Sequence, residues 1–388
     1  MHNGEVTFKK NGFYSSDLAI FRNYNCILES GYKLKDFQLA FQTYGHLNKQ
    51  KSNAILICHA LTGDQFVAQK HPITNKEGWW SKIVGPNKSI DTNKYFVICS
   101  NVLGGCIGST GPNEINPNTK KIYNLEFPSI TIKDMVQVQS FLIDALQIKK
   151  LFAVAGASMG AMQVLQWVID YPKKVSNAIH IAGALKHSTQ NIAFHEVGRQ
   201  AVMSDPGWSN GNYIDIKTIP EKGLAIARMI AHITYLSEDA LQRKFGRKLQ
   251  SRDIISFGFD ADFQVESYLR YQGKSFVDRF DANSYLYITR AMDYFDVTKL
   301  FPRAIELNAD LNKHINYLII SFTSDWLFPT KENFEIVEIL NRNICKVSYT
   351  EIETDKGHDS FLLDEPDFNK AIMGFLNSNF NNVLEDNK

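Results

Sequence analysis

The sequence has few cysteines, and they follow no recognisable pattern. Its 388 residues include only five, at widely separated positions: Cys26, Cys58, Cys99, Cys106 and Cys345. No pair has the C-x-x-C spacing that is typical of zinc and redox sites, and an odd, scattered set argues against a disulfide framework. We therefore expect no metal site and no disulfide, and we expect the protein to work in the reducing environment of the cytoplasm.

Long apolar runs and an excess of one charge are also missing. No stretch approaches the roughly 18 apolar residues that a membrane span needs, and the first residues lack the apolar core of a signal peptide. The 42 lysines and arginines nearly balance 41 aspartates and glutamates, so the net charge is +1, without the basic excess of a nucleic-acid-binding protein. We therefore expect a soluble protein that binds neither membranes nor nucleic acid.

A phosphate-binding loop is missing as well. Residues 104–111 are rich in glycine and follow an apolar run, but they lack the Gly-Lys-Ser/Thr ending of such loops. We expect them to form a structural loop at the rim of a functional site.

The sequence does contain short apolar segments that alternate with helical patterns. Nearly all-apolar, β-rich runs are typical of strands that are buried on both faces of a parallel sheet. Such runs occupy residues 54–58, 94–100, 151–155 and 177–183. Among them, residues 131–148 open with a Thr-x-x-Asp capping signal and carry apolar residues at helical spacing. This alternation predicts an α/β fold with a mostly parallel, doubly wound sheet.

The alternation stops in the middle of the chain. Residues 185–300 show helical patterns without regular strand alternation, and strand patterns return at residues 315–322 and 346–353. The chain is also longer than the size at which single cores usually stop growing. We therefore expect a core domain of residues 1–184 plus 301–388, with residues 185–300 inserted as a helical lid domain.

A G-x-S-x-G pattern spans residues 156–160, where a strand should be followed by a helix. In this context the pattern is typical of the nucleophile turn of α/β-hydrolases, with Ser158 as the nucleophile. A serine hydroxyl needs a histidine to take its proton and a carboxylate to orient that histidine. Asp325 and His358 follow the two later strands in the order that this fold uses. Each alone would be interpreted as a helix cap or a loop histidine, but together with Ser158 they predict a catalytic triad.

Acyl transfer also requires backbone N–H groups that stabilise a developing oxyanion. In this fold one comes from the residue after the nucleophile, here Met159, and the other from an early loop. The segment His-Ala-Leu-Thr-Gly at residues 59–63 directly follows an apolar strand. Leu61 is therefore the expected second donor.

Several long stretches outside the triad carry further information. They include LAFQTYGHLN, AILICHALTGDQFVA, AGASMGAMQVLQW, QNIAFHEVGRQA, ARMIAHITYLSEDALQRKFGR, SFTSDWLFP and GHDSFLLDEP. With these stretches the chain resembles the homoserine O-acetyltransferase family over nearly its whole length. The resemblance implies an α/β-hydrolase fold and an enzyme that transfers acetyl from acetyl-CoA to the hydroxyl of L-homoserine, in methionine biosynthesis. It also implies a helical lid, a homodimer formed through it, and no bound cofactor, with acetyl-CoA as a substrate.

The resemblance further implies two substrate-binding residues, Arg228 and Asp359. These types suit homoserine because a guanidinium can bind its carboxylate in bidentate fashion and a carboxylate can receive its ammonium. Without the family, they would be interpreted as a solvated helix residue and a helix cap. Family members usually carry glycine where this chain has Ala157 and Ala161, so each position adds a methyl group near the nucleophile turn.

Alternatives remain open at this stage. Some relatives use succinyl-CoA or acylate serine, and a carboxyl-ester hydrolase would need the same fold and triad. A catalytically silent binding protein of this fold would ordinarily have lost a triad residue, whereas this chain keeps all three. Arg228 and Asp359 favour an amino-acid acceptor over a simple ester. We expect a ping-pong reaction through an acetyl-serine at Ser158.

Overall fold

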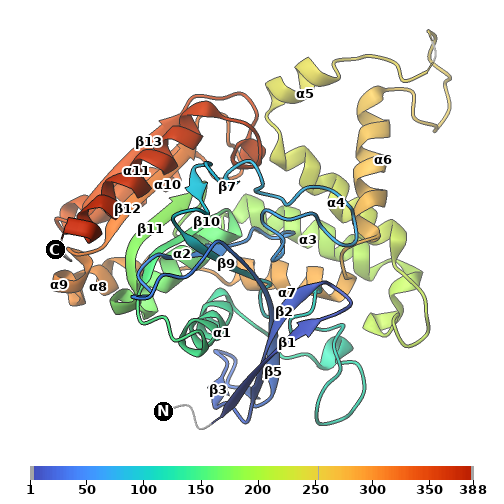
Figure 1. The fold of residues 1–388 in the computed structure, drawn as a ribbon. Coiled ribbons are helices and arrows are strands. Elements are labelled where there is room, and N and C mark those ends of the chain that lie inside the picture. Colours follow the sequence, from blue (N-terminus) through green and yellow to red (C-terminus); the bar gives the residue numbers. More distant parts are fainter. Residues whose placement is uncertain (1–3, 252, 386–388) are drawn as a thin grey trace.

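A nine-stranded sheet forms the centre of the protein in the computed structural model, which describes residues 4–251 and 253–385. In spatial order its strands are β1 (Glu5–Asn11), β2 (Ser16–Arg22), β5 (Phe37–Tyr44), β9 (Phe96–Ser100), β6 (Ala54–Cys58), β10 (Leu151–Ala157), β11 (Val175–Ile181), β12 (Asn316–Phe322) and β13 (Lys346–Ile352) (Figure 1). The strands from β9 to β13 run parallel, whereas β1, β2 and β5 pair antiparallel. The predicted mostly parallel α/β sheet is confirmed.

Helices cover both faces of this sheet. Alternate residues of β6 belong to different apolar clusters, with Leu56 in one and Ile57 in the other. The first cluster includes residues of α1 (Ile132–Ala145), α2 (Met159–Asp170), α8 (Leu300–Leu307) and α10 (Thr330–Arg342), and the second includes residues of α11 (Pro366–Glu385). The capping signal predicted before α1 is present, because Thr131 and Asp134 form a reciprocal capping box.

The smaller elements are short. They are the strand pairs β3 (Cys26–Ile27) with β4 (Lys33–Leu34) and β7 (Val84–Gly85) with β8 (Ile90–Asp91), the helix α9 (Ala309–Asn312), and the 3₁₀ turns Asn124–Glu126, Pro172–Lys174, Pro206–Gly211 and His358–Leu362. The glycine-rich loop at residues 104–111 packs against β5, where the Oγ atoms of Ser109 and Thr110 accept the N–H groups of Ala40 and Gln38.

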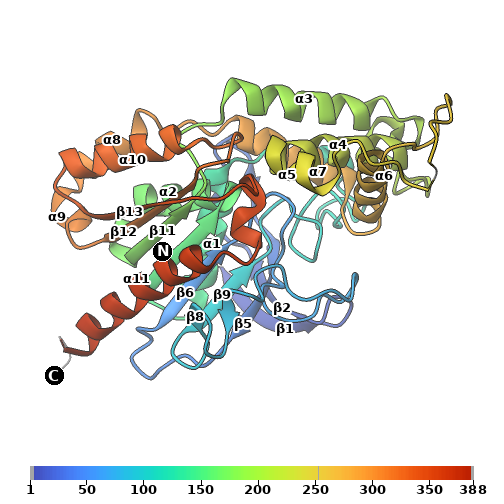
Figure 2. The same ribbon diagram turned by 90° about the horizontal axis from the view of Figure 1, so that it is seen from above.

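Five further helices gather on one side of the sheet (Figure 2). They are α3 (Thr189–Met203), α4 (Glu221–Tyr235), α5 (Glu238–Lys244), α6 (Gln264–Val277) and α7 (Ala282–Asp293). The chain enters this group after β11 and leaves it before β12. The helices therefore lie near the carboxyl ends of the parallel strands, where α/β folds place their sites.

Two contacts join this helical group to the sheet's loops. The indole N–H of Trp326 donates to the carbonyl of Leu236 over 3.1 Å. Gly357 has a φ of +77°, and a Cβ there would lie 2.5 Å from the backbone nitrogen of Ser237. Only glycine therefore lets the loop after β13 approach the end of α4 this closely.

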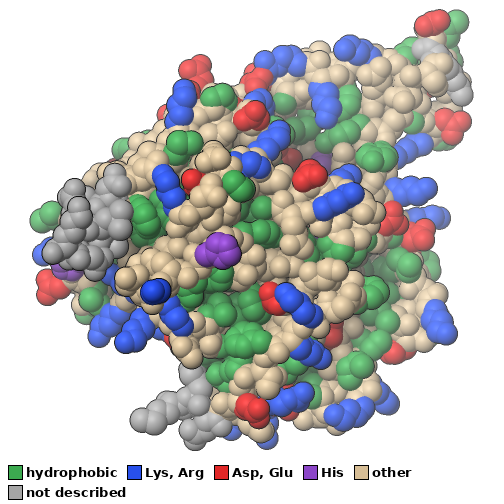
Figure 3. Space-filling view, viewed as in Figure 1, with side chains coloured by type: hydrophobic (Ala, Val, Ile, Leu, Met, Phe, Trp, Pro, Cys, Tyr) green, Lys and Arg blue, Asp and Glu red, His purple; other side chains and the backbone are tan. Residues whose placement is uncertain are grey.

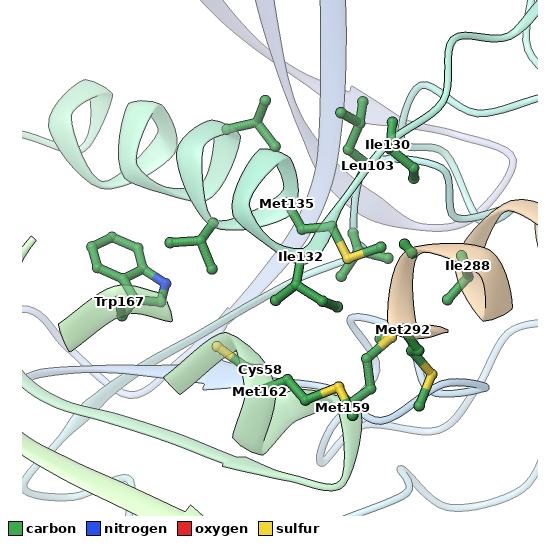
Figure 4. Packing of buried hydrophobic residues seen from close by; sticks show 14 of the residues in the cluster. Cys58, Leu103, Ile130, Ile132, Met135, Met159, Met162, Trp167, Ile288 and Met292 are labelled. Atoms are coloured by element: carbon green, nitrogen blue, oxygen red, sulfur yellow. The ribbon is translucent and has the colours of Figure 1, made fainter. Parts of the chain in front are cut away.

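Methionines join the helical group to the core. Figure 4 shows Met135 of α1, Met159 and Met162 of α2, and Met292 of α7 packed together. All four are at most 3% exposed. Because unbranched Met side chains fill irregular gaps, this packing anchors α7 against the start of α2.

The face of the molecule in Figure 3 carries charges of both signs. Lysine and arginine side chains are interspersed there with aspartates and glutamates, in keeping with the net charge of +1. All five cysteines are free. Among the described residues, no helix combines the length and apolar character needed to cross a membrane.

Candidate active site

Ser158 occupies a sharp turn between β10 and α2. Its φ of 58° and ψ of −122° lie outside the regions that L-residues ordinarily adopt, and its N–H is held by the carbonyl of Ile181 at 3.0 Å. A Cβ at Gly156 would lie 2.4 Å from the carbonyl oxygen of Gly160, and a Cβ at Gly160 would lie 2.1 Å from that of Cys58. The turn therefore requires both glycines of the G-x-S-x-G pattern.

The methyl groups of Ala157 and Ala161 are accommodated beside this turn. Ala157 is 3% exposed and Ala161 is fully buried. A Cβ on Gly183 would lie only 2.6 Å from the Cβ of Ala161. The methyl group of Ala161 therefore occupies space that Gly183 leaves open.

The predicted histidine and aspartate lie side by side. Nδ1 of His358 is 2.7 Å from Oδ2 of Asp325, and Oδ1 of Asp325 accepts the N–H groups of Leu327 and Phe328 at 2.9 Å each. Burial alone would lower the pKa of His358, but the charge of Asp325 and this hydrogen bond raise it above its ordinary value of 6.5. The carboxylate is thus fixed by three hydrogen bonds and orients the imidazole.

The same imidazole is available to a nucleophile. Nε2 of His358 is buried and has no hydrogen-bond partner among the described residues. The rings of Tyr235 and Phe328 lie 6.1 and 5.2 Å from that of His358, centroid to centroid, and both line a cavity of about 40 Å³ with Ser158. The structure therefore brings Ser158, Asp325 and His358 to the same edge of the sheet.

Both expected oxyanion donors border Ser158. Met159 is the first residue of α2, where a backbone N–H has no partner within the helix. Leu61 lines the cavity together with Ser158. In the part of the chain that the structure describes, neither N–H donates to a protein acceptor, so both are available to a ligand.

His59 orients the Leu61 donor, a role that sequence reasoning missed. The carbonyl of Ala60 accepts Nδ1–H of His59 at 2.8 Å and the N–H of Gly63 at 2.9 Å. Nε2 of His59 in turn accepts the N–H of Val102 at 3.1 Å. Because a trans peptide points its C=O and N–H in opposite directions, fixing the Ala60 carbonyl also fixes the N–H of Leu61.

Arg228 and Asp359 carry opposite charges that no protein group neutralises directly. Nη1 of Arg228 donates to Oγ1 of Thr62 at 3.2 Å, and its guanidinium lies 4.9 Å from the ring centroid of Phe276. Within the described residues, neither Arg228 nor Asp359 forms an ion pair. Burial raises the pKa of Asp359 to about 6, although His358 and Arg228 oppose this shift. A half-buried cation and anion without ion-pair partners among the described residues suit a zwitterionic ligand.

A second, larger cavity begins at Thr62. It has a volume of about 540 Å³ and is lined by Thr62, Lys76, Trp79, Arg228 and Arg279, among others. Arg279 donates to the carbonyl of Thr62 at 2.9 Å. Thr62 is therefore contacted by two arginines, and both arginines line this cavity together with Thr62.

The fold and this site place the chain in a known class. Residues 53–365 match the family model of the alpha/beta hydrolase fold. The structure of esterase E22 superimposes with a TM-score of 0.81 at 27% identity, over 97% of this chain and 100% of that one. The chain is thus a member of the α/β-hydrolase class.

Closer relatives narrow the class. A homoserine O-acetyltransferase of Rhodospirillum rubrum is 59% identical over 349 residues, which cover 90% of this chain and 89% of the relative. The crystal structure of the homoserine O-acetyltransferase from Bacillus anthracis matches with a TM-score of 0.81 at 28% identity, over 97% of this chain and 98% of that one. The chain belongs to the homoserine O-acetyltransferase family.

Proposed function

We propose that this chain transfers an acetyl group from acetyl-CoA to the hydroxyl of L-homoserine, as an enzyme of methionine biosynthesis. The family assignment supports this activity, and one structural observation carries it. Arg228 and Asp359 are oppositely charged and form no ion pair within the described residues, so they match the two charges of an amino-acid acceptor. Asp359 directly follows His358, and the guanidinium of Arg228 lies 5.5 Å from the ring centroid of Tyr235, which in turn lies 6.1 Å from that of His358. A hydrolase of neutral esters has no use for such a pair.

The first half-reaction forms an acetyl-enzyme. His358 takes the proton of Ser158 as its oxygen attacks the thioester carbonyl of acetyl-CoA. The N–H groups of Leu61 and Met159 stabilise the oxyanion of the tetrahedral intermediate, and the C–S bond then breaks. The thiolate of CoA takes the proton from His358 and leaves. The large cavity at Thr62 offers room for the donor, and the chemistry needs no metal or bound cofactor.

The second half-reaction transfers the acetyl group. Arg228 binds the carboxylate of homoserine and Asp359 binds its ammonium, which directs the side-chain hydroxyl toward the acetyl-serine. His358 takes the hydroxyl proton as the oxygen attacks, and the proton then returns to Ser158. The product is O-acetylhomoserine.

Water must be kept from the acetyl-enzyme between the two steps, because it would attack in the same geometry. We assign this role to residues 185–300 as a lid domain on the core formed by residues 1–184 and 301–388. We further propose that two copies associate through the lid and that the enzyme works in the cytoplasm.

The direct test measures the substrates. The purified protein is incubated with acetyl-CoA or succinyl-CoA, each with L-homoserine or L-serine, and thiol release is followed. We expect fast release only with acetyl-CoA and homoserine. Release that is fast without any acceptor would identify a hydrolase instead, and release only with serine or succinyl-CoA would refute the substrate assignment.

A variant pair tests the acceptor site. Arg228→Ala should raise the KM for homoserine by roughly 30- to 100-fold, because a charge-assisted bidentate contact is lost. Arg228→Lys keeps the positive charge but loses the bidentate guanidinium. Its KM for homoserine should therefore lie between those of the wild type and Arg228→Ala. Slow acceptor-free cleavage of acetyl-CoA reports on the triad and should change far less than this KM. If both activities fell equally, Arg228 would not be an acceptor-binding residue.

A further inference from the structure

Three ionisable side chains outside the triad meet beside the Ser158 cavity. Nδ1 of His187 lies 3.0 Å from Oδ1 of Asp293, and Nδ1 of His195 lies 2.9 Å from the same oxygen. The two imidazole rings are 4.7 Å apart, centroid to centroid, and both line the cavity of about 40 Å³ that contains Ser158. We call this group the His187–Asp293–His195 cluster.

The hydrogen bonds of the cluster define which ring atoms carry protons. Burial opposes ionisation of Asp293, but hydrogen bonds from both histidines and the charge of Arg199 hold its pKa well below its usual range. The ionised carboxylate can only accept, so Nδ1 of each ring donates. Burial lowers the pKa of His195, which keeps that ring neutral. Nε2 of His195 has no hydrogen-bond partner within the described residues, so a lone pair is offered at the cavity wall.

The nearest cation cannot serve a ligand in the cavity. Arg199 is 3% exposed, and its Nη1 lies 2.7 Å from Oδ2 of Asp293. Its Nε and Nη2 atoms donate to Glu196 at 3.2 and 2.9 Å, and Nη1 also donates to Thr289. Two carboxylates therefore share one guanidinium, so Asp293, Glu196 and Arg199 together carry a formal net charge of −1.

A divalent metal is the other ligand that two histidines and an aspartate suggest. Their ligand atoms lie within 4.8 Å of one another. However, Arg199 already pairs with Asp293, so a dication would turn the formal net charge of these groups from −1 to +1 in a buried setting. The cluster therefore fits an electrostatic role in the cavity better than a metal site.

We infer that the His187–Asp293–His195 cluster selects the acyl group, by giving the acyl cavity an acceptor-lined, negatively charged wall that rejects acyl groups ending in a carboxylate. This inference rests on the proposed function, because the cavity holds Ser158 and Leu61 and so would receive the acyl chain. A small neutral group such as acetyl needs no hydrogen bond or ion pair with the cavity wall. At this wall a succinyl carboxylate would lose its hydration and meet the lone pair of His195 and a net negative charge.

The test uses activated esters, because acylation of Ser158 by p-nitrophenyl esters releases nitrophenol without CoA or homoserine. Two esters of equal length are compared: the hemisuccinate, and the levulinate, in which a methyl group replaces the terminal O⁻. Both are measured on the full chain and on Ile230→Ala, which enlarges the same cavity without changing its charge. We expect the levulinate to acylate at least about tenfold faster than the hemisuccinate in both proteins. Equal rates in both would overturn the inference.

Variants of the cluster complete the test in the Ile230→Ala background. His195→Lys adds a positive charge and should narrow the difference between the two esters by about tenfold, whereas His195→Gln keeps a neutral hydrogen-bonding group and should preserve it. If both substitutions reduced the preference for the levulinate equally, packing rather than charge would explain that preference. Glu196→Gln removes one negative charge from a partly exposed position and should also narrow the difference in rate between the two esters. It provides the same test if His195→Lys fails to fold.

The outcome is separable from that of the proposed function. Failure to acetylate homoserine from acetyl-CoA would refute the function, whereas the ester comparison reports only on acyl selectivity at Ser158. If the wild-type protein acetylates homoserine but reacts equally fast with both esters, the proposed function stands and the inference about acyl selection is refuted. Thermal unfolding of each variant checks that the fold is intact.

Discussion

Asp325→Asn is the sharpest perturbation of the triad, because the structure fixes which way the new amide must face. Oδ1 of Asp325 accepts the N–H groups of Leu327 and Phe328, and Oδ2 faces Nδ1 of His358. The amide oxygen must keep the position of Oδ1, since the opposite orientation would set an NH₂ group against two N–H donors. The NH₂ group then faces Nδ1 of His358 and donates to it. The proton moves to Nε2, which can no longer accept one from Ser158.

The expected loss of activity in Asp325→Asn follows from the same contacts. Turning the amide to recover the active tautomer leaves two buried N–H groups without acceptors, at about 1–3 kcal/mol each. The total of about 2–6 kcal/mol corresponds to a loss of roughly 30-fold to 10⁴-fold in kcat. The assay is thiol release from acetyl-CoA with saturating homoserine. Thermal unfolding should remain close to wild type, because the hydrogen bonds of Leu327 and Phe328 persist.

Asp325→Ala is the matched control. It removes the acceptor for both N–H groups, so it should lower the melting temperature as well as kcat. A loss of less than about tenfold in Asp325→Asn, with an unchanged fold, would refute the fixed-orientation argument. Equal melting temperatures for the two variants would show that the hydrogen bonds to Oδ1 matter little.

Three further predictions concern the turn and the acceptor site. Gly160→Ala should abolish activity and cost about 2 kcal/mol or more, because its Cβ meets the Cys58 carbonyl; retention of near-normal thiol release would contradict this. The KM for homoserine should rise as the pH falls through about 6, because Asp359 becomes protonated and loses its hold on the ammonium; in Asp359→Asn that dependence should vanish from the pH profile. Gly183→Ala should destabilise the fold by about 1–3 kcal/mol in denaturant titrations, and adding Ala161→Gly should recover part of the loss; no recovery would place the strain elsewhere.

The sequence was sufficient for features that depend on local patterns. Apolar runs predicted the parallel strands, and the glycines around Ser158 predicted a turn that only they permit. Chain order then placed Asp325 and His358 at strand ends, and the structure brings these two side chains to 2.7 Å. The antiparallel strand β1 was missed because its residues are mostly exposed and show no regular apolar alternation.

Features built from distant residues could not be predicted in this way. His59 orients the Leu61 donor, and its own ring accepts the N–H of Val102, which lies 43 residues further along the chain. Asp293 meets His187 and His195 across 106 and 98 residues. No periodicity or spacing encodes such contacts, because they depend on how elements that are far apart in the sequence pack together. The catalytic roles of the predicted residues remain predictions that the experiments above address.

The close packing of Ala161 against Gly183 also restricts how this sequence can evolve. A side chain at position 183 would collide with the methyl group of Ala161 and with the ring of His180. A lineage can therefore acquire alanine at position 161 only while position 183 is glycine. Once acquired, that alanine makes the glycine harder to replace. A substitution at position 161 therefore restricts which residues are tolerated at position 183, which lies 22 residues further along the chain.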